Sequence, residues 1–204
     1  LEHYHGRSST SCPSPSDYLT AYGDAKYVFC VTITATLSGS YNAAMVAKKT
    51  YEKAHPDRRV FVLNSLSTGP EMALAIDKTQ ELILAGKEFD DICEQVTEYN
   101  KKTGLLFMLE SMRNLANNGR VSPIVAKMAG LLGIRVVAKA SDKGDIEPLN
   151  KCRGEKKALE TLVEHLKNLG LKEGRVRIAH CFSEPAAIAL RDLIRDKFAR
   201  VQVD

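Results

Sequence analysis

The sequence lacks tryptophan and holds few aromatic residues of any kind, so it offers little stacking surface for single-stranded nucleic acid. Aromatic residues make up 6% of the 204 positions, and the formal net charge of +4 is modest. No hydrophobic run approaches the roughly 20 residues of a membrane helix. No basic segment followed by hydrophobic residues opens the printed sequence as a secretory leader. We therefore expect neither nucleic-acid binding nor a membrane span.

The five cysteines include no C-x-x-C pair, which argues against a zinc site and against a disulfide framework. Their odd number and wide spacing, together with the missing leader, predict a cytoplasmic location. The first strand–turn–helix segment matches neither G-x-x-x-x-G-K-[ST] nor G-x-G-x-x-G, the two nucleotide-binding fingerprints. We expect no metal site and no cofactor.

What the sequence does contain is a hydroxyl-rich turn between a strand and a helix. Residues 27–34 are rich in β-branched and aromatic side chains, the chain breaks at Ser38-Gly39, and a helix is expected over 41–54. The free amides and the dipole of such a helix favour an anion. The hydroxyl residues of the turn are Thr34, Thr36, Ser38 and Ser40. Because the turn has no lysine or arginine, it suits a carboxylate or one phosphate better than a nucleoside triphosphate. The alternative is that Ser38 only caps the helix and Gly39 relieves a tight turn.

The order of expected elements predicts an α/β protein of two domains. A parallel-sheet, Rossmann-like N-terminal domain (1–122) is expected to pack against a smaller α+β C-terminal domain (123–204). The expected strands are residues 27–34, 59–63, 103–109, 135–139, 145–151, 175–179 and 200–203. The expected helices are residues 16–22, 41–54, 67–86, 89–102, 111–117, 123–132, 155–169 and 184–198. A hairpin-like loop is expected at 141–144, where a glycine ends the turn.

Six segments, in the same order along the chain, resemble the signatures of the DegV family. Residues 32–44 (T-I-T-A-T-L-S-G-S-Y-N-A-A) resemble T-I-S-S-x-L-S-G-T-Y-x-S-A, and residues 10–14 (T-S-C-P-S) resemble T-S-x-P-S. Three more are N-S-L-S at 64–67, N-G-R-V at 118–121 and R-G-E-K-K-A at 153–158. The sixth consists of A-H-C at 179–181 followed by E-P at 184–185. The resemblance runs from about residue 9 to residue 204.

This resemblance implies the EDD fold and a long-chain fatty acid bound between two domains. In many DegV proteins a separate partner kinase then converts the carboxylate to an acyl-phosphate, so this chain is itself expected not to be an enzyme. The family's threonine and serine ligands correspond to Thr10 and Ser38, and Ser11 and Gly39 are neighbours that can add donors. Several donors are needed because burying a lone carboxylate is costly. Without the resemblance, capping of the helix at 16–22 is the favoured explanation for Thr10 and Ser11.

The resemblance also suggests residues for the acyl chain and for the partner. Phe107, Leu115, Met128 and Ile134 are candidates for lining the acyl chain, with ordinary core packing as the alternative. Arg120 and Arg153 stand in family segments and are candidates for facing the partner kinase. The alternative for both is a solvated surface arginine.

The chain departs from the family pattern at both ends. The opening Asp-Ser motif and the closing G-x-H-x-G-P-G segment are absent, so relative to the family the chain, and with it the carboxylate site, is expected to be incomplete. Two other functions stay open: a small enzyme acting on a phosphorylated or carboxylated metabolite at the same turn, and an interaction or structural protein. No G-x-S-x-G elbow is present, and His180 at a strand end is better explained structurally, so no catalytic residue is expected.

Overall fold

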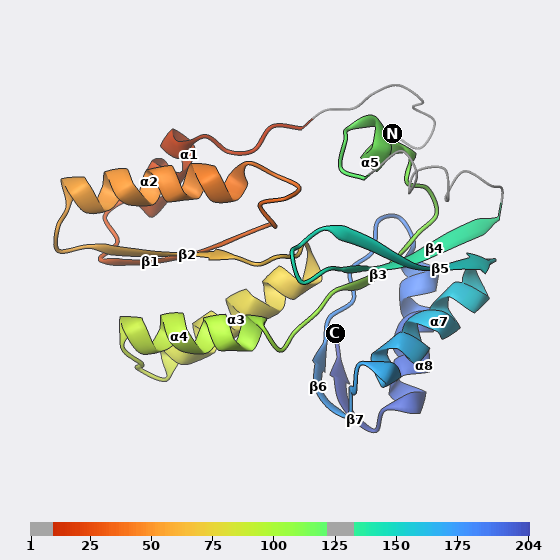
Figure 1. Cartoon of the computed structure of the whole chain (residues 1–204). Coiled ribbons are helices and arrows are strands. Elements are labelled where there is room, and N and C mark those ends of the chain that lie inside the picture. Colours follow the sequence, from red (N-terminus) through yellow and green to blue (C-terminus); the bar gives the residue numbers. More distant parts are fainter. Residues whose placement is uncertain (1–9, 122–132) are drawn as a thin grey trace. The chain divides into compact units, whose positions relative to one another are not determined.

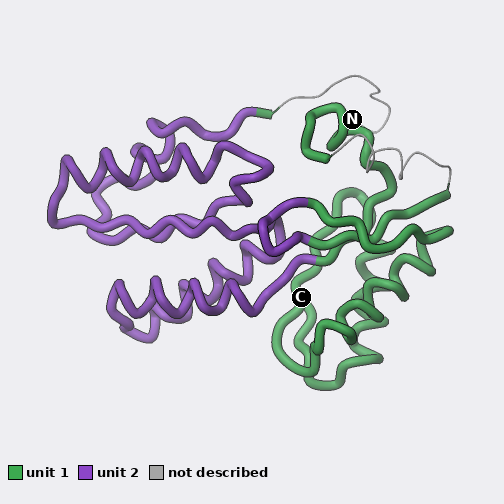
Figure 2. The backbone as a smooth tube through the Cα atoms, in the orientation of Figure 1, with its two compact units in different colours: residues 1–10, 106–139, 146–204 green, residues 11–105, 140–145 purple. Residues whose placement is uncertain are grey.

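The computed structural model describes residues 10–121 and 133–204, which form a mixed α/β fold (Figure 1). The described residues divide into two compact units (Figure 2). Unit 2 consists of residues 11–105 and 140–145, and unit 1 takes the remaining described residues. The predicted boundary between residues 122 and 123 lies outside the described residues, so that boundary stays a prediction. The helix expected at 123–132 also lies outside them.

The centre of unit 2 is a parallel pair of strands with two helices on each face (Figure 1). The strands are β1 (Tyr27–Thr32) and β2 (Arg59–Asn64), in register from Tyr27↔Arg59 to Thr32↔Asn64. The helices are α1 (Pro15–Tyr22) and α2 (Ser40–Ala54) on one face, and α3 (Pro70–Leu84) and α4 (Phe89–Asn100) on the other.

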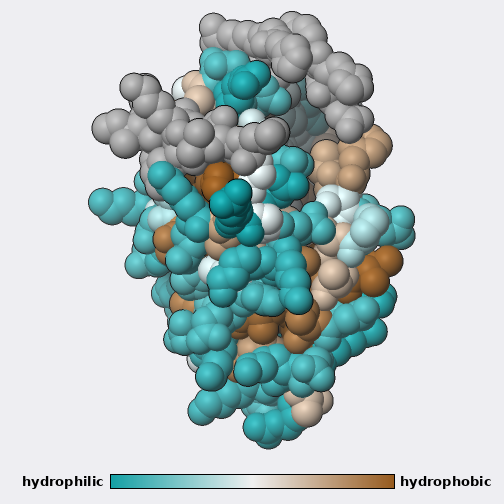
Figure 3. Space-filling view, turned by 90° about the vertical axis from the view of Figure 1, so that its right-hand side faces the viewer, coloured by the Kyte–Doolittle hydropathy of each residue, from teal (hydrophilic) through white to brown (hydrophobic). Residues whose placement is uncertain are grey.

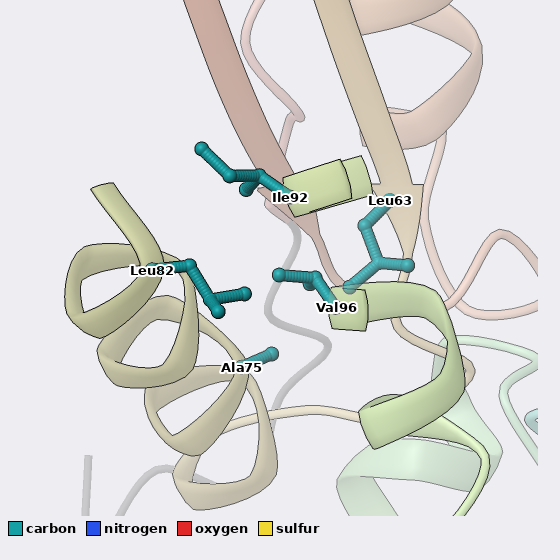
Figure 4. Close-up of a cluster of buried hydrophobic side chains, with 5 residues drawn as sticks. All are labelled: Leu63, Ala75, Leu82, Ile92 and Val96. Carbon is teal, nitrogen blue, oxygen red and sulfur yellow. The ribbon is translucent and has the colours of Figure 1, made fainter. Parts of the chain in front are cut away.

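Side chains of β1 and β2 alternate between the two helical layers. Val28 and Val60 pack in the cluster formed with α1 and α2, whereas Phe29 and Phe61 pack against the cluster formed with α3 and α4. Both strands are therefore hydrophobic on both sides, as expected for parallel strands covered on two faces. Figure 4 shows the second cluster, whose buried members are Leu63, Ala75, Leu82, Ile92 and Val96.

Unit 1 contains a three-stranded sheet and a parallel strand pair. The three strands, in the order β3-β4-β5, are β3 (Leu106–Leu109), β4 (Ile134–Ala140) and β5 (Ile146–Arg153), and β3 runs antiparallel to β4. The parallel pair is β6 (Glu173–Val176) and β7 (Arg200–Val203). The helices of this unit are α5 (Arg113–Asn117), α7 (Glu155–Asn168) and α8 (Glu184–Lys197).

Two expected strands are shorter in the structure, and a third is displaced along the chain. The first ends at residue 32 instead of 34, since the Thr34 amide donates to the Ser67 carbonyl beyond the end of β2. The third begins at 106 instead of 103, and the Thr103 hydroxyl instead donates to Glu71. β6 spans 173–176 instead of 175–179, although the Ile178 amide still donates to the Asp204 carbonyl past the strand end.

Hydrophilic side chains cover most of the face of the molecule drawn in Figure 3, and hydrophobic residues form smaller patches among them. This is the pattern expected when the larger hydrophobic side chains pack inside. Within residues 10–121 and 133–204, no helix combines the length and the hydrophobicity required to cross a membrane.

Candidate functional site

The N-terminus of α2 lies where the loop after β1 ends, at the carboxyl edge of the parallel pair. Gly39 is the N-cap residue, contributes no side-chain cap, and is followed by a first turn without an acidic residue. The first amides of a helix have no partner within it, and the helix dipole places partial positive charge there. An external carboxylate is therefore favoured at this end of α2.

The N-terminus of α3, which follows β2, already has a carboxylate of its own. Glu71 stands in its first turn, is only 6% exposed, and accepts a hydrogen bond from the Thr103 hydroxyl at 2.6 Å. An acidic side chain in the first turn stabilises the positive end of a helix. Of the two helices that follow β1 and β2, α2 is thus the one whose N-terminus suits an external anion.

Ser38 and Ser40 place a pair of hydroxyls at the start of α2. Their Oγ atoms are 2.9 Å apart, and the Ser40 amide donates to Ser38 Oγ at 3.2 Å. Ser38 thus accepts from the first helical amide, but it precedes the N-cap residue Gly39 and is not the side-chain cap that the alternative assumed. Two hydroxyls carry two hydrogens and their mutual contact uses one, so the second can reach another acceptor. Burial, the largest influence, raises the pKa of the nearby Tyr18, and its interaction with the Ser40 side chain acts in the opposite direction.

Thr34 and Thr36 form a second hydroxyl pair in the same loop. Their Oγ1 atoms are 3.1 Å apart, and Thr36 Oγ1 donates to the Gly144 carbonyl at 2.7 Å. Because a hydroxyl has one hydrogen, Thr36 must accept from Thr34. Thr34 is almost fully buried, and its amide donates to the Ser67 carbonyl at 2.9 Å. This pair is therefore occupied by the protein and holds the loop in place.

The loop after β2 contributes further polar groups at the same edge. The Asn64 side chain accepts from the amides of Ala35 at 3.1 Å and Leu66 at 3.4 Å, which ties the two loops together. Ser67 is 2% exposed, and its hydroxyl has no hydrogen-bond partner among the described residues. A buried hydroxyl without a partner is costly. This edge therefore has one more polar group than its own hydrogen bonds use.

Gly39 brings the two carboxylate motifs of the sequence together. Its φ of −72° is accessible to any residue, so the turn does not need glycine for its backbone, contrary to the alternative stated above. A Cβ at this position would instead lie 3.1 Å from Cys12 Sγ, a tight contact. The segment that begins with Ser11, which is exposed, thus adjoins the turn that contains Ser38 and Gly39.

Thr10 and Ser11 are not the caps of the first helix. The N-cap of α1 is Ser14, whose Oγ accepts from the Asp17 amide at 3.2 Å while the Asp17 carboxylate accepts from the Ser14 amide at 2.7 Å. Thr10 is exposed and belongs to unit 1. The capping alternative is therefore wrong for these two residues, and their carboxylate role stays a prediction.

Two of the four acyl-chain candidates, Phe107 and Ile134, share one face of the sheet in unit 1. Phe107 packs with the buried cluster that includes Val136 and Ala138, and strand alternation places Ile134 on the same face. Leu115 is a partly buried residue of α5. The opposite face packs against α7. Met128 lies outside the described residues.

The partner-facing candidates are both exposed residues of unit 1. Arg120 follows α5, and its Nη1 donates to the Asn118 carbonyl at 2.6 Å. Arg153 is the last residue of β5 and precedes Lys156 and Lys157 of α7, which are exposed as well. The structure leaves both arginines accessible to a partner.

His180 and the metal-ligating residue types form no metal centre in the described part of the chain. The His180 ring Nδ1 accepts from the Ser183 amide at 3.3 Å, a structural contact before α8. Across 10–121 and 133–204, no three histidine, cysteine, aspartate or glutamate side chains gather as metal ligands.

Sequence patterns alone assigned no role to Gly144 or Ser67. The glycine of a hairpin loop and a serine after a strand are common, and neither residue type reveals a contact with another loop. Leu66, between Ser65 and Ser67, has φ +55°, which is uncommon for a non-glycine residue and has no signature in the sequence.

Comparisons with known proteins agree on one family. The profile described as "Uncharacterised protein, DegV family" matches residues 2–204. A DegV domain-containing protein of Streptococcus pneumoniae is 42% identical over 196 residues, which cover 96% of this chain and 70% of that protein.

Two solved structures are also very similar to this one. A DegV family protein from Eubacterium eligens, loaded with heptadecanoic acid, is 42% identical with a TM-score of 0.94, over 99% of this chain and 74% of that chain. The Fatty Acid Kinase (Fak) B3 protein of Streptococcus pneumoniae, loaded with linoleic acid, is 41% identical with a TM-score of 0.95. The match covers 99% of this chain and 73% of that chain.

Proposed function

Because the chain belongs to the DegV family, we propose that it binds one long-chain fatty acid and presents the carboxylate to a partner kinase. The observation that carries this proposal is the α2 N-terminus with its serine pair, in a turn without lysine or arginine. The chain is also similar to proteins crystallised with fatty acids. Hydroxyls and amides can satisfy a carboxylate by charge-assisted hydrogen bonds.

The proposed ligand contacts are those that the sequence suggests. Ser38, Gly39, Ser11 and Thr10 contribute donors for the carboxylate. The face of the sheet that includes Phe107 and Ile134, with Leu115 of α5 and Met128, receives the acyl chain. The apolar character of this face supports the assignment. No comparison supports a small enzyme at the same turn.

The proposal also includes the types of the two domains and the cellular location of the protein. We infer a Rossmann-like N-terminal domain (1–122) and a smaller α+β C-terminal domain (123–204). The doubly covered parallel pair of unit 2 supports the first of these. The cytoplasmic location stays a prediction.

Purified protein is expected to carry or take up one fatty acid. Native mass spectrometry should show one added mass of a long-chain fatty acid, and lipid extraction should identify it. Methyl linoleate is the matched control, because it keeps the acyl chain but cannot present a carboxylate to the α2 N-terminus. A protein that emerges without lipid and ignores added linoleic acid would contradict the proposal.

The chain alone is expected to make no acyl-phosphate from ATP, Mg²⁺ and linoleic acid. Phosphoryl transfer needs a phosphate cradle, metal-binding carboxylates and a positioned base. The α2 turn supplies at most an anion cradle, which is why a partner is required. Thin-layer chromatography of radiolabelled ATP reactions tests this, and acyl-phosphate formed without a second protein would refute it.

We place the kinase-facing surface at Arg120 and Arg153 of unit 1. The exposed lysines beside Arg153 add positive charge to this surface. Surface charges of this kind chiefly steer association, so phosphorylation with a fatty acid kinase added should slow as salt rises. A rate that does not depend on salt would remove these residues from the interface.

A further inference from the structure

The tip of the β4–β5 hairpin, residues 141–145, is a tight loop held by its own hydrogen bonds. Ser141 Oγ accepts from the amides of Lys143 at 3.2 Å and Asp145 at 3.1 Å. The Ser141 carbonyl accepts from the Gly144 amide at 2.8 Å, and its amide donates to the Asp145 carbonyl at 2.9 Å. Such a loop has little freedom to shift when a neighbour presses on it.

This tip belongs to unit 2 and lies directly against the loop that leads to α2. The Gly144 carbonyl accepts the Thr36 hydroxyl, and Gly144 is buried at the contact. A Cβ on Gly144 would lie 2.0 Å from Thr34 Oγ1, 2.9 Å from Thr34 Cβ and 3.1 Å from Leu66 Cα. Among the described glycines, no other would bring a Cβ within 3 Å of a neighbour.

The contact between Thr36 and Gly144 determines which hydroxyl is the donor in each of two consecutive hydrogen bonds. Thr34 donates to Thr36, and Thr36 donates to the Gly144 carbonyl, as the hydrogen count requires. On the other side, the Thr34 amide donates to the Ser67 carbonyl. The Thr34–Thr36 segment is thus held between the hairpin tip and the loop after β2. Ser38 follows two residues later, so its position depends on this segment.

We propose that Gly144 is a positioning residue for the carboxylate site. Because Gly144 has no side chain, the hairpin tip can lie against Thr34, and its carbonyl accepts from the Thr36 hydroxyl. These two contacts hold the Thr34–Thr36 segment in the position from which Ser38 and the α2 amides reach the ligand. The inference rests on the proposed function, since it assigns a positioning element to that same site.

The test compares Gly144→Ala with Gly86→Ala in the full chain. Both glycines have positive φ, +82° and +69°, so both alanines face the same kind of backbone strain. Only at Gly144 would the new methyl collide, because no described atom lies within 4 Å of a Cβ at Gly86. The measured quantity is the Kd for linoleic acid, from displacement of fluorescent parinaric acid. We expect Gly144→Ala to weaken binding at least fivefold and Gly86→Ala to stay within twofold.

A second pair of variants addresses the hydrogen bond without introducing a clash. Thr36→Val removes the donor to Gly144 and should weaken binding at least threefold, whereas Thr36→Ser keeps the hydroxyl and should restore the affinity that Thr36→Val loses. Thermal unfolding of every variant separates a change in stability from a change in affinity. If Gly144→Ala does not fold, the Thr36 pair decides.

The outcomes separate this inference from the proposed function. Wild-type protein that binds linoleic acid, with Gly144→Ala and Thr36→Val binding equally well, overturns the positioning role and leaves the function standing. An equal loss of affinity in Gly86→Ala overturns it too, since the effect would then be general destabilisation. Wild-type protein that does not bind overturns the function and the inference together.

Discussion

Leu82→Ala is expected to lower the free energy of unfolding by about 2–5 kcal/mol, the range for removing a large aliphatic side chain from a packed core. Leu82 is 5% exposed and points from α3 toward Ala75 and Val96 in the cluster of Figure 4. The smaller side chain leaves a cavity between α3 and α4 that these neighbours can only partly fill. For a protein of this size the melting temperature should fall on the order of 5–15 °C.

Leu84→Ala is the matched control for this prediction. It makes the same substitution on the same helix two residues later, at a side chain that is 79% exposed. Helix propensity changes alike in both variants, so the difference between them reports the packing of Leu82. We expect Leu84→Ala to stay within about 0.5 kcal/mol of wild type. Urea unfolding followed by circular dichroism measures both variants. Equal losses would show that the cluster does not stabilise the unit as described.

The type and order of most elements could be predicted because their signals are local. The helix predicted over 41–54 is α2 (Ser40–Ala54), and the strand predicted over 59–63 is β2 (Arg59–Asn64). The mixed α/β class followed from the alternation of such segments, and the family resemblance from residues adjacent in the chain. Neither required knowledge of contacts between distant residues.

Strand ends were less predictable because they depend on the partner. Thr34 has the β-branched character of a strand, yet its amide bonds Ser67 instead of extending the pairing of β1 with β2. Residue type cannot reveal where β1 ends, since a threonine suits both a strand and the loop that follows it. The early start of β6 has the same cause: pairing with β7 includes Gly174, a residue that a propensity argument keeps out of a strand.

Close approaches of the backbone are the part of the site that no local pattern could reveal. Relief of a tight turn was the alternative explanation for Gly39, but its backbone is ordinary and the approach of Cys12 explains the glycine better. Gly144 was expected only as a hairpin residue, although it contacts Thr34, far away in the sequence. In both cases the reason for glycine is the missing Cβ, which depends on what folds against it.

Ser38→Ala is expected to weaken fatty acid binding by about 1.5–3 kcal/mol, the range for a hydrogen bond to a charged group. That corresponds to a loss of roughly ten- to a hundredfold in affinity. The Ser38–Ser40 pair has a hydroxyl hydrogen beyond the one used in its own contact, and at the α2 N-terminus a carboxylate is the acceptor that gains most from it. Thr10→Ala is expected to fall in the same range if its hydroxyl meets the same carboxylate.

The variant should remain folded, because it loses only local bonds to Ser40: the contact between the two hydroxyls and the bond that Ser38 accepts from the Ser40 amide, a cap-like bond worth about 1 kcal/mol. Ser38→Thr keeps the hydroxyl and should recover most of the affinity that Ser38→Ala loses. Ser111→Ala is the control for losing a bond between a serine hydroxyl and a nearby helix amide. Ser111 Oγ accepts from the Arg113 amide at the start of α5, just as Ser38 Oγ accepts from the Ser40 amide. Isothermal titration with linoleic acid gives the affinity of each variant, and thermal unfolding gives its stability. If Ser38→Ala binds as tightly as Ser111→Ala, the carboxylate does not meet Ser38, and the ligand must be held by a different part of the chain.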